Sequence, residues 1–427
     1  MIPKTRNYRW WVVALLFAAT IINYVDRQTF SILAKEIQTA LHISDLGYSG
    51  VVQLFLISYT LAYLVTGRVT DYLGTKIGMV VFIIWWSIAE ALTGISRSVF
   101  TLGFYRLMVG LGEPGNWTVQ AKAIAEWFPP RDRGLAYGIC TAGATAGATV
   151  AVPMVAFLAA SHGWRAPFIV TGLLGLLWVV PWAAWYKSPN IVQETGEVVR
   201  DLPAGLFRES LPQESEWQRW KILLGDLNTW LLTLARFLTD PVWYFFLFWF
   251  PKYLLSVHSM SLIRVGELAW VVYFAAGMGT IIGGWASGFL VKRGLQPVSA
   301  RKRIMLISAL IVPSSALLAF VPTANWALLI SSLVVFAQLA WQVTLGTLII
   351  DLYPQRIVAT VFGIIATGSG LGGILSTNAI GHLVTQFSYR PVFVMMAFLH
   401  PCALFLLWKI RAPIPVSLRE TDRFPAR

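Results

Sequence analysis

Long apolar runs recur along the whole chain and constrain its fold more than any other feature. A helix needs roughly 20 apolar residues to cross a bilayer, and we count twelve runs of about that length. Their expected bounds are 9–36, 46–70, 77–95, 98–124, 133–160, 164–186, 227–255, 262–291, 302–321, 325–350, 357–386 and 390–411. Because a backbone in lipid must satisfy its own hydrogen bonds, each run is expected to be an α-helix. The sequence therefore predicts an all-α membrane protein with twelve transmembrane helices.

The composition excludes an ordinary soluble chain. Of the 427 residues, 57% are hydrophobic and 12% are charged, whereas soluble domains carry about 25% charged residues. The first apolar run lacks the features of a cleaved signal peptide, so we interpret it as a span. Cys140 and Cys402 both lie in apolar runs, and their positions indicate neither a disulfide nor a metal site.

The longest hydrophilic segment separates the sixth apolar run from the seventh. It begins "KSPNIVQETGEVVRDLP" and is rich in charged residues. We therefore predict two six-helix bundles, at 1–186 and 227–411, joined by a cytoplasmic linker at 187–226 and followed by a cytoplasmic tail at 412–427.

The distribution of Lys and Arg predicts the orientation. If both termini are cytoplasmic, the cytoplasmic segments hold 23 of the 33 basic residues and the opposite side holds 6. Cytoplasmic loops of membrane proteins carry such an excess. The net charge of +13 is explained by this asymmetry, so we expect the lipid bilayer as a partner and no nucleic acid.

The two halves of the chain resemble each other. "EWFPPRDRGLAYG" (126–138) aligns with "DLYPQRIVATVFG" (351–363), 225 positions later. The same offset pairs Gly143 with Gly368. Parallel repeats of this kind are typical of transporters whose binding site lies at the midplane between two rocking halves.

Four charged residues are expected at membrane depth in the first half. Asp26 and Arg27 are adjacent in "IINYVDRQTF", and neighbours on a helix point about 100° apart, so each needs a partner elsewhere. Arg106 and Glu113 lie seven positions apart in the fourth run, on one helix face. We expect Asp26 to pair with Arg106, which leaves Arg27 and Glu113 able to exchange partners. A purely structural network, or side chains that reach the outer interface, are the alternatives.

Ionisable residues inside a membrane usually serve function, and the residue types here suggest which. Arginine binds a carboxylate bidentately and keeps its charge, so Arg27 is the first candidate for a substrate carboxylate and Arg106 the second. Glu113, among the small residues of "GLGEPG", and Asp26 are the proton-coupling candidates.

Aromatic and amide side chains complete the predicted binding site. Aromatic rings form platforms for sugars, and amides bind hydroxyls; the alternative for each is helix packing or a helix–helix hydrogen bond. These further candidates are Tyr24, Tyr59, Trp243, Tyr244, Gln338 and Asn378. Arg236 and Asp240, four residues apart in the seventh run, are expected to pair along their helix.

The stretch "GRVTDYLGTK" resembles the loop signature of the major facilitator superfamily, which it matches at Gly67, Asp71, Gly74 and Lys76. This resemblance implies the major facilitator fold and a cytoplasmic gate at that loop. "NYVDRQTFSI", "YRLMVGLGEPGNW" and "AEWFPPRDRG" are similar to the anion:cation symporter branch, which includes hexuronate and galactonate carriers. In such carriers the acids that match Asp26 and Glu113 carry proton coupling, and Arg27 agrees with the branch's carboxylate-binding pattern.

We therefore expect a proton-coupled symporter that imports a sugar acid, a hexuronate or an aldonate, by alternating access. The proton would be the coupling ion, with no cofactor and no metal, and the protein would be a monomer in a bacterial inner membrane. A carrier of another organic anion (a dicarboxylate, an aromatic acid or sialic acid) or an anion exchanger is the alternative. A membrane sensor or enzyme is disfavoured, because the chain has no soluble catalytic domain and no nucleophile motif.

Overall fold

The computed structural model describes residues 5–187, 189 and 216–410, and the long elements in these ranges are helices. The first half contains α1 (Thr5–Ile32), α2 (Ala34–Leu41), α3 (Asp45–Thr93), α4 (Val99–Gly112), α5 (Gly115–Trp127), α6 (Pro130–His162) and α7 (Arg165–Trp185). The second half contains α9 (Glu216–Gly225), α10 (Leu227–Phe248), α11 (Phe250–Val257), α12 (Leu262–Leu268), α13 (Trp270–Lys292), α14 (Pro297–Ile311), the 3-10 helix η1 (Val312–Ala319), α15 (Ala324–Leu352), α16 (Val358–Gln386) and α17 (Arg390–Trp408). The predicted all-α fold is confirmed.

Ten helical segments in the described ranges are long and apolar enough to cross a membrane. This number is two below the twelve predicted spans, for two local reasons. Helix α3 covers the predicted second and third spans, which are separated by Gly74 at a φ of 78°, a conformation that glycine adopts without steric cost. The predicted fourth span is divided at Pro114 into α4 and α5, each too short to be counted alone.

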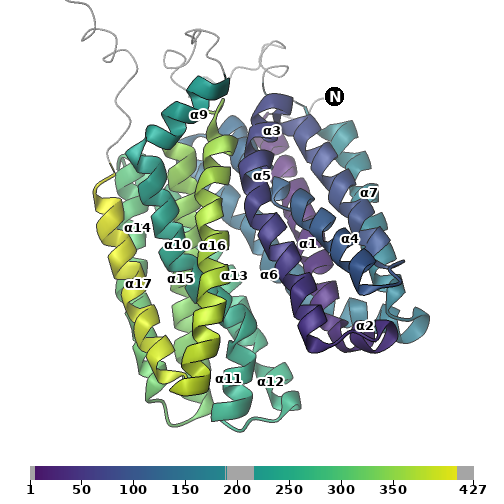
Figure 1. The fold of residues 1–427 in the computed structure, drawn as a ribbon. Coiled ribbons are helices and arrows are strands. Elements are labelled where there is room, and N and C mark those ends of the chain that lie inside the picture. The colour runs from purple at the N-terminus through teal and green to yellow at the C-terminus, as the bar shows by residue number, and fades with distance from the viewer. Residues whose placement is uncertain (1–4, 188, 190–215, 411–427) are drawn as a thin grey trace, which may run out of the picture.

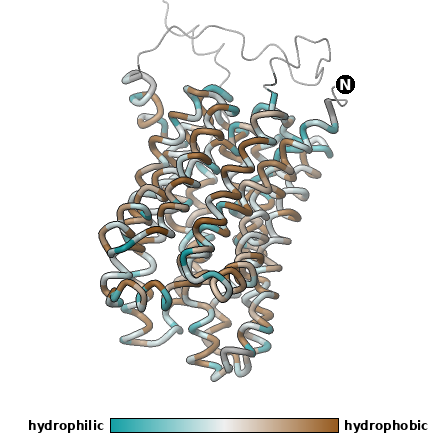
Figure 2. The backbone as a smooth tube through the Cα atoms, turned by 90° about the vertical axis from the view of Figure 1, so that its right-hand side faces the viewer, coloured by the Kyte–Doolittle hydropathy of each residue, from teal (hydrophilic) through white to brown (hydrophobic). Residues whose placement is uncertain are grey.

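The chain forms a multi-pass membrane protein whose two halves stand side by side (Figure 1). The start of α1, helix α9 and the end of α17 lie toward the same face, which we call the terminal face. Hydrophobic residues predominate along the helices, as Figure 2 shows, and many large ones, such as Trp11, Phe157 and Phe398, are exposed where lipid would cover them. Of the predicted linker and tail, mainly α9 lies within the described residues.

Glycines bring the two halves into backbone contact at two places. At Gly67 in α3 a Cβ would overlap the carbonyl oxygen of Ala359 in α16, and at Gly363 it would overlap that of Tyr63. Helices α6 and α13 meet in the same way, since a Cβ on Gly284 would overlap the carbonyl oxygen of Gly134. Small residues allow such close approach of helices in membranes.

Polar contacts join the halves in the same region. The Asp71 carboxylate accepts hydrogen bonds from the Thr360 amide (2.7 Å) and hydroxyl (2.6 Å), and from Lys122 at 2.8 Å. Arg133 forms an ion pair with Asp351 at 2.9 Å. Two further contacts between the halves are Lys292–Asp132 (3.2 Å) and Arg301 to the Pro130 carbonyl oxygen (2.6 Å). The terminal face is therefore closed in this conformation.

The four residues of the gate signature occupy different places at this closure. Gly67 provides the close helix approach, Asp71 provides the hydrogen bonds to α16, and Gly74 provides the break in α3. The Lys76 side chain is exposed, and its backbone carbonyl accepts a hydrogen bond from the Trp182 indole at 3.1 Å.

We expect Gly67→Ala to open the terminal face. The added Cβ overlaps the backbone of α16, and overpacking of this kind costs about 1–3 kcal/mol. Distances between spin labels on Cys residues introduced at Tyr72 and Arg356, both exposed, would report the change, in a Cys402→Ser background that removes the exposed native thiol.

The matched control for this experiment is Gly50→Ala, on the same helix, where an added Cβ meets nothing within 4 Å. A Gly67→Ala distance distribution identical to that of the control would contradict the assigned closure.

Candidate functional site

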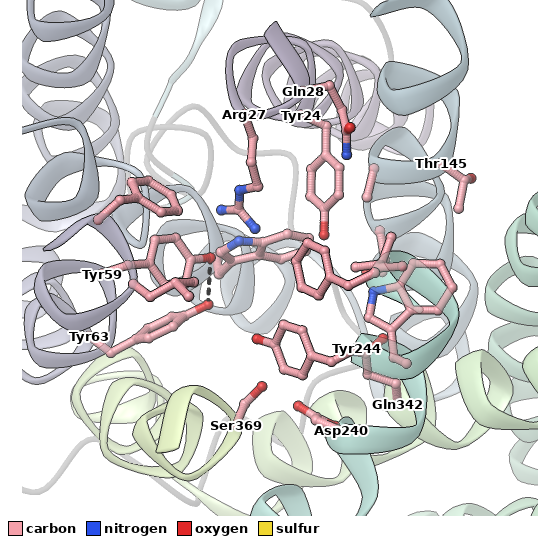
Figure 3. A pocket seen from close by; sticks show the side chains of 18 of the residues that line it. Tyr24, Arg27, Gln28, Tyr59, Tyr63, Thr145, Asp240, Tyr244, Gln342 and Ser369 are labelled. Atoms are coloured by element: carbon pink, nitrogen blue, oxygen red, sulfur yellow. Dashed lines mark hydrogen bonds between the residues drawn. The ribbon is translucent and has the colours of Figure 1, made fainter. Parts of the chain in front are cut away.

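A cavity between the two halves contains most of the predicted binding residues. Its walls come from α1, α3, α4, α5 and α6 of the first half and from α10, α15 and α16 of the second. Six predicted residues line it: Tyr24, Arg27, Tyr59, Arg106, Trp243 and Tyr244. Figure 3 shows Arg27 and Tyr24 pointing into it from one side and Tyr244, Asp240 and Ser369 on the other.

The Arg27 guanidinium is held on one edge by Glu113. Its Nη2 and Nε donate to the same carboxylate oxygen, Oε2, at 2.6 and 3.2 Å. The rings of Tyr24 and Tyr59 lie 5.0 and 4.6 Å from the guanidinium carbon, a cation–π arrangement. The Glu113 side chain is fully buried, whereas 24% of the Arg27 side chain is exposed. Arg27 therefore presents charge to the cavity, and Glu113 balances it from behind.

Glu113 owes its position to the break in the predicted fourth span. It follows the last residue of α4, and Pro114 separates it from α5. The carboxylate's other oxygen, Oε1, is buried and accepts no hydrogen bond from the described residues. One of the two oxygens of the Glu113 carboxylate therefore has no hydrogen bond to the described residues in this conformation.

Arg106 pairs with Glu90, a residue that the sequence analysis missed. Arg106 Nη1 lies 2.9 Å from Glu90 Oε2, and both side chains are almost completely buried. The rings of Phe30 and Phe55 each lie 4.7 Å from the guanidinium carbon. A signal was available, because Glu90 is the one acid in the apolar run "VVFIIWWSIAEALTG".

The predicted pairing of Asp26 with Arg106 is wrong, because Glu90 occupies Arg106. Asp26 is fully buried, and neither carboxylate oxygen has a hydrogen-bond partner among the described residues. Thr171 and Trp86 face it, outside hydrogen-bond geometry. Burial of an ionised carboxylate without a partner is very costly, which sets Asp26 apart from the paired acids Glu90 and Glu113.

The predicted pair in the seventh span is confirmed. Arg236 Nε donates to Asp240 Oδ2 at 3.1 Å, four residues along α10, and both residues line the cavity. The other carboxylate oxygen, Oδ1, is buried and has no partner among the described residues.

Two predicted binding residues do not reach the cavity. Gln338 is buried in α15, where its side-chain amide donates to the Thr239 carbonyl oxygen at 3.1 Å. Asn378 is exposed, and its amide donates to the Ile374 carbonyl oxygen of its own helix at 3.0 Å. Gln338 lies one turn from the cavity-lining Gln342, but its side chain is hydrogen-bonded to α10, whereas Asn378 lies on the side of α16 opposite the cavity-lining Ser369. An apolar run reveals neither the packing of α10 nor the rotation of α16.

Several cavity residues were not predicted as part of the site. Gln28, Tyr63, Tyr137 and Ser369 line it, and the Tyr63 hydroxyl lies 3.0 Å from the hydroxyl of the predicted Tyr59. The offset of 225 pairs Ser369 with Ala144, which also lines the cavity, so the repeat brings equivalent positions of the two halves to the same cavity.

The sequence model of the protein family described as the Major Facilitator Superfamily matches residues 16–377 of this chain. The chain is 27% identical to the hexuronate transporter of Escherichia coli (strain K12), over 99% of each chain. It is 29% identical to the galacturonate transporter of Dickeya chrysanthemi, over 72% of this chain and 90% of that one. It is 27% identical to a probable galactarate/D-glucarate transporter of Bacillus subtilis (strain 168), over 92% of this chain and 90% of that one.

The solved structure of the proton:xylose symporter XylE has the same fold, with a TM-score of 0.75 at 15% identity, covering 96% of this chain and 97% of that chain. The chain belongs to the major facilitator superfamily, and it is a transporter, not an enzyme.

We expect Glu90→Gln to destabilise the folded protein far more than Asp26→Asn. Loss of Glu90 leaves the buried Arg106 charge without its partner, which typically costs about 3–5 kcal/mol. Asp26 has no ion pair to lose, so its amide variant should cost about 1 kcal/mol or less. Chemical denaturation in detergent, followed by tryptophan fluorescence, measures both.

The double variant Glu90→Gln/Asp26→Asn tests whether Arg106 moves to Asp26 when Glu90 is lost. If the double variant loses more free energy of unfolding than the two single variants together, Arg106 has moved to Asp26 in Glu90→Gln. Equal losses for the two single variants would contradict the pairing.

Proposed function

We propose that this transporter imports a sugar acid, a hexuronate or an aldonate, together with protons, across a bacterial inner membrane. The names of the relatives support the substrate class, since they include hexuronate, galacturonate and D-galactonate transporters. The observation that carries the proposal is Arg27, a cavity-lining guanidinium with part of its donor set unused.

The free edge of Arg27 suits the carboxylate of such a substrate. A guanidinium has five N–H donors, and the bonds to Glu113 come from Nε and Nη2 alone. Nη1 makes no hydrogen bond to the described residues and is available to an incoming anion. Tyr24 and Tyr59 pack around the guanidinium. Their hydroxyls can bind the hydroxyls of the sugar, and their ring faces can pack against its carbons.

Competition for Arg27 couples the substrate to protons. A substrate carboxylate on Arg27 weakens the Arg27–Glu113 pair, and a buried carboxylate that loses its counter-ion takes up a proton. Asp26, buried without an ion pair, is the second proton-holding group. Arg106, held by Glu90, acts as the neighbouring positive charge of this network.

Alternating access would follow from rocking of the halves around the cavity. The closed terminal face, with its glycine contacts and the Asp71–Thr360 hydrogen bonds, then represents one end of the cycle. We further propose that this face is cytoplasmic, as the excess of Lys and Arg predicts, and that the protein works as a monomer.

A dicarboxylic sugar acid is the alternative substrate. Relatives named as probable galactarate/D-glucarate transporters favour it, and so does Arg236, the cavity guanidinium of the second half. An anion exchanger that uses no proton is the alternative mechanism.

We expect Arg27→Ala to weaken sugar-acid binding by at least about a hundredfold, because charge-assisted hydrogen bonds contribute about 1.5–3 kcal/mol each. Ligand-induced thermal stabilisation of the purified protein with galacturonate measures this loss. The control is Arg303→Ala, which removes an exposed charge outside the cavity. Undiminished binding by Arg27→Ala would contradict the assigned role.

We expect Glu113→Gln to retain substrate exchange but to lose accumulation driven by a proton gradient, because an amide cannot take up a proton. Proteoliposomes loaded with substrate measure exchange, and an imposed pH gradient measures accumulation in the same preparation. If the variant still concentrates substrate against a gradient, Glu113 is not the coupling residue.

A further inference from the structure

We infer that the Arg236–Asp240 pair forms a hydroxyl-binding subsite and makes the cavity select sugar acids that carry a single carboxylate. This inference rests on the proposed function and extends it, because it chooses between uronates or aldonates and the dicarboxylic alternative.

Three arginines line the cavity, Arg27, Arg106 and Arg236, and they differ in where their counter-ions lie. Arg106 is almost completely buried, and its counter-ion Glu90 is not part of the lining. Glu113 balances Arg27 but does not line the cavity, so an anion can approach Arg27 without facing the acid. Asp240 itself lines the cavity together with Arg236. A carboxylate that approached Arg236 would therefore also face the Asp240 carboxylate.

The pair is also fixed in place. Arg236 and Asp240 are one helical turn apart on α10, so their separation of 3.1 Å depends on a single helix. The Arg236 guanidinium also lies over the Phe362 ring at 5.6 Å, and the side chains of the pair are 11% and 1% exposed. This packing keeps Asp240 beside Arg236.

A neutral ion pair of this kind matches sugar hydroxyls. Each hydroxyl is both a donor and an acceptor, while Arg236 has donors beyond the Nε that binds Asp240, and Asp240 has an unused oxygen, Oδ1. Tyr244, Gln342 and Ser369 add neutral polar groups to the same side of the cavity. The second half thus offers donors and acceptors but no uncompensated positive charge in the described lining.

A second carboxylate would meet repulsion at this subsite. Arg236 is already neutralised by Asp240, and like charges brought together across a binding interface are strongly unfavourable. With one carboxylate on Arg27, a dicarboxylic acid with the same carbon chain length as a uronate would bring its other carboxylate toward Asp240. A uronate places a neutral carbonyl or hydroxyl there.

The variant that isolates this effect is Asp240→Asn, which keeps the shape of the side chain and removes its charge. We expect the purified full-length variant to gain at least about tenfold in affinity for galactarate relative to galacturonate. Glu267→Gln is the matched control, since it removes an exposed acid of the same half outside the cavity. The readout is the ratio of the two dissociation constants from ligand-induced thermal stabilisation and proteoliposome counterflow.

The wild-type protein provides a second test that does not depend on folding of the variant. We expect galacturonate to bind at least about tenfold more tightly than galactarate. Equal binding of the two acids by the wild type, or an unchanged ratio in Asp240→Asn, would overturn the inference and leave the proposed function standing. Absence of binding by every sugar acid to folded wild-type protein would instead overturn the proposed function itself.

Discussion

The cost of burying charge in a membrane protein governs the arrangement of the helices. The pairs Arg27–Glu113, Arg106–Glu90 and Lys122–Asp71 each join different helical segments of the first half. Each pair links the position of one helical segment to the charge of another, and removal of one partner leaves a buried charge that is strongly destabilising. In the proposed function, a proton or an anion would act on the bundle through the same pairs that hold it together.

The two halves share a backbone repeat but differ in charge. The first half contains an acid without an ion pair, Asp26, beside two buried ion pairs. The cavity side of the second half contains the self-neutralised pair of α10 and neutral polar groups. In the proposed function, the first half would therefore carry the ion coupling, and the second half would add the hydroxyl-binding subsite.

The sequence predicted local features well and features that depend on helix rotation poorly. Apolar runs predicted the helices, and the spacing of Arg236 and Asp240 predicted their pair because both lie on one helix. The partner of Arg106 could not be derived this way, since Glu90 and Asp26 were both acids on neighbouring spans and only packing selects between them. The predictions for Gln338 and Asn378 were wrong for a similar reason: the sequence shows that a residue is polar, but not which helix packs against it or which way its helix turns it.

The glycine contacts of the terminal face also have a thermodynamic consequence. Surfaces that carry long side chains lose rotamer freedom each time they meet, at up to about 2 kcal/mol for each side chain. At Gly67, Gly134, Gly284 and Gly363 the meeting surfaces have no rotamers to lose. In the proposed cycle, closure of this face would therefore have a small side-chain entropy cost at these points, and the polar contacts around Asp71 and Asp351 would set the balance between open and closed states.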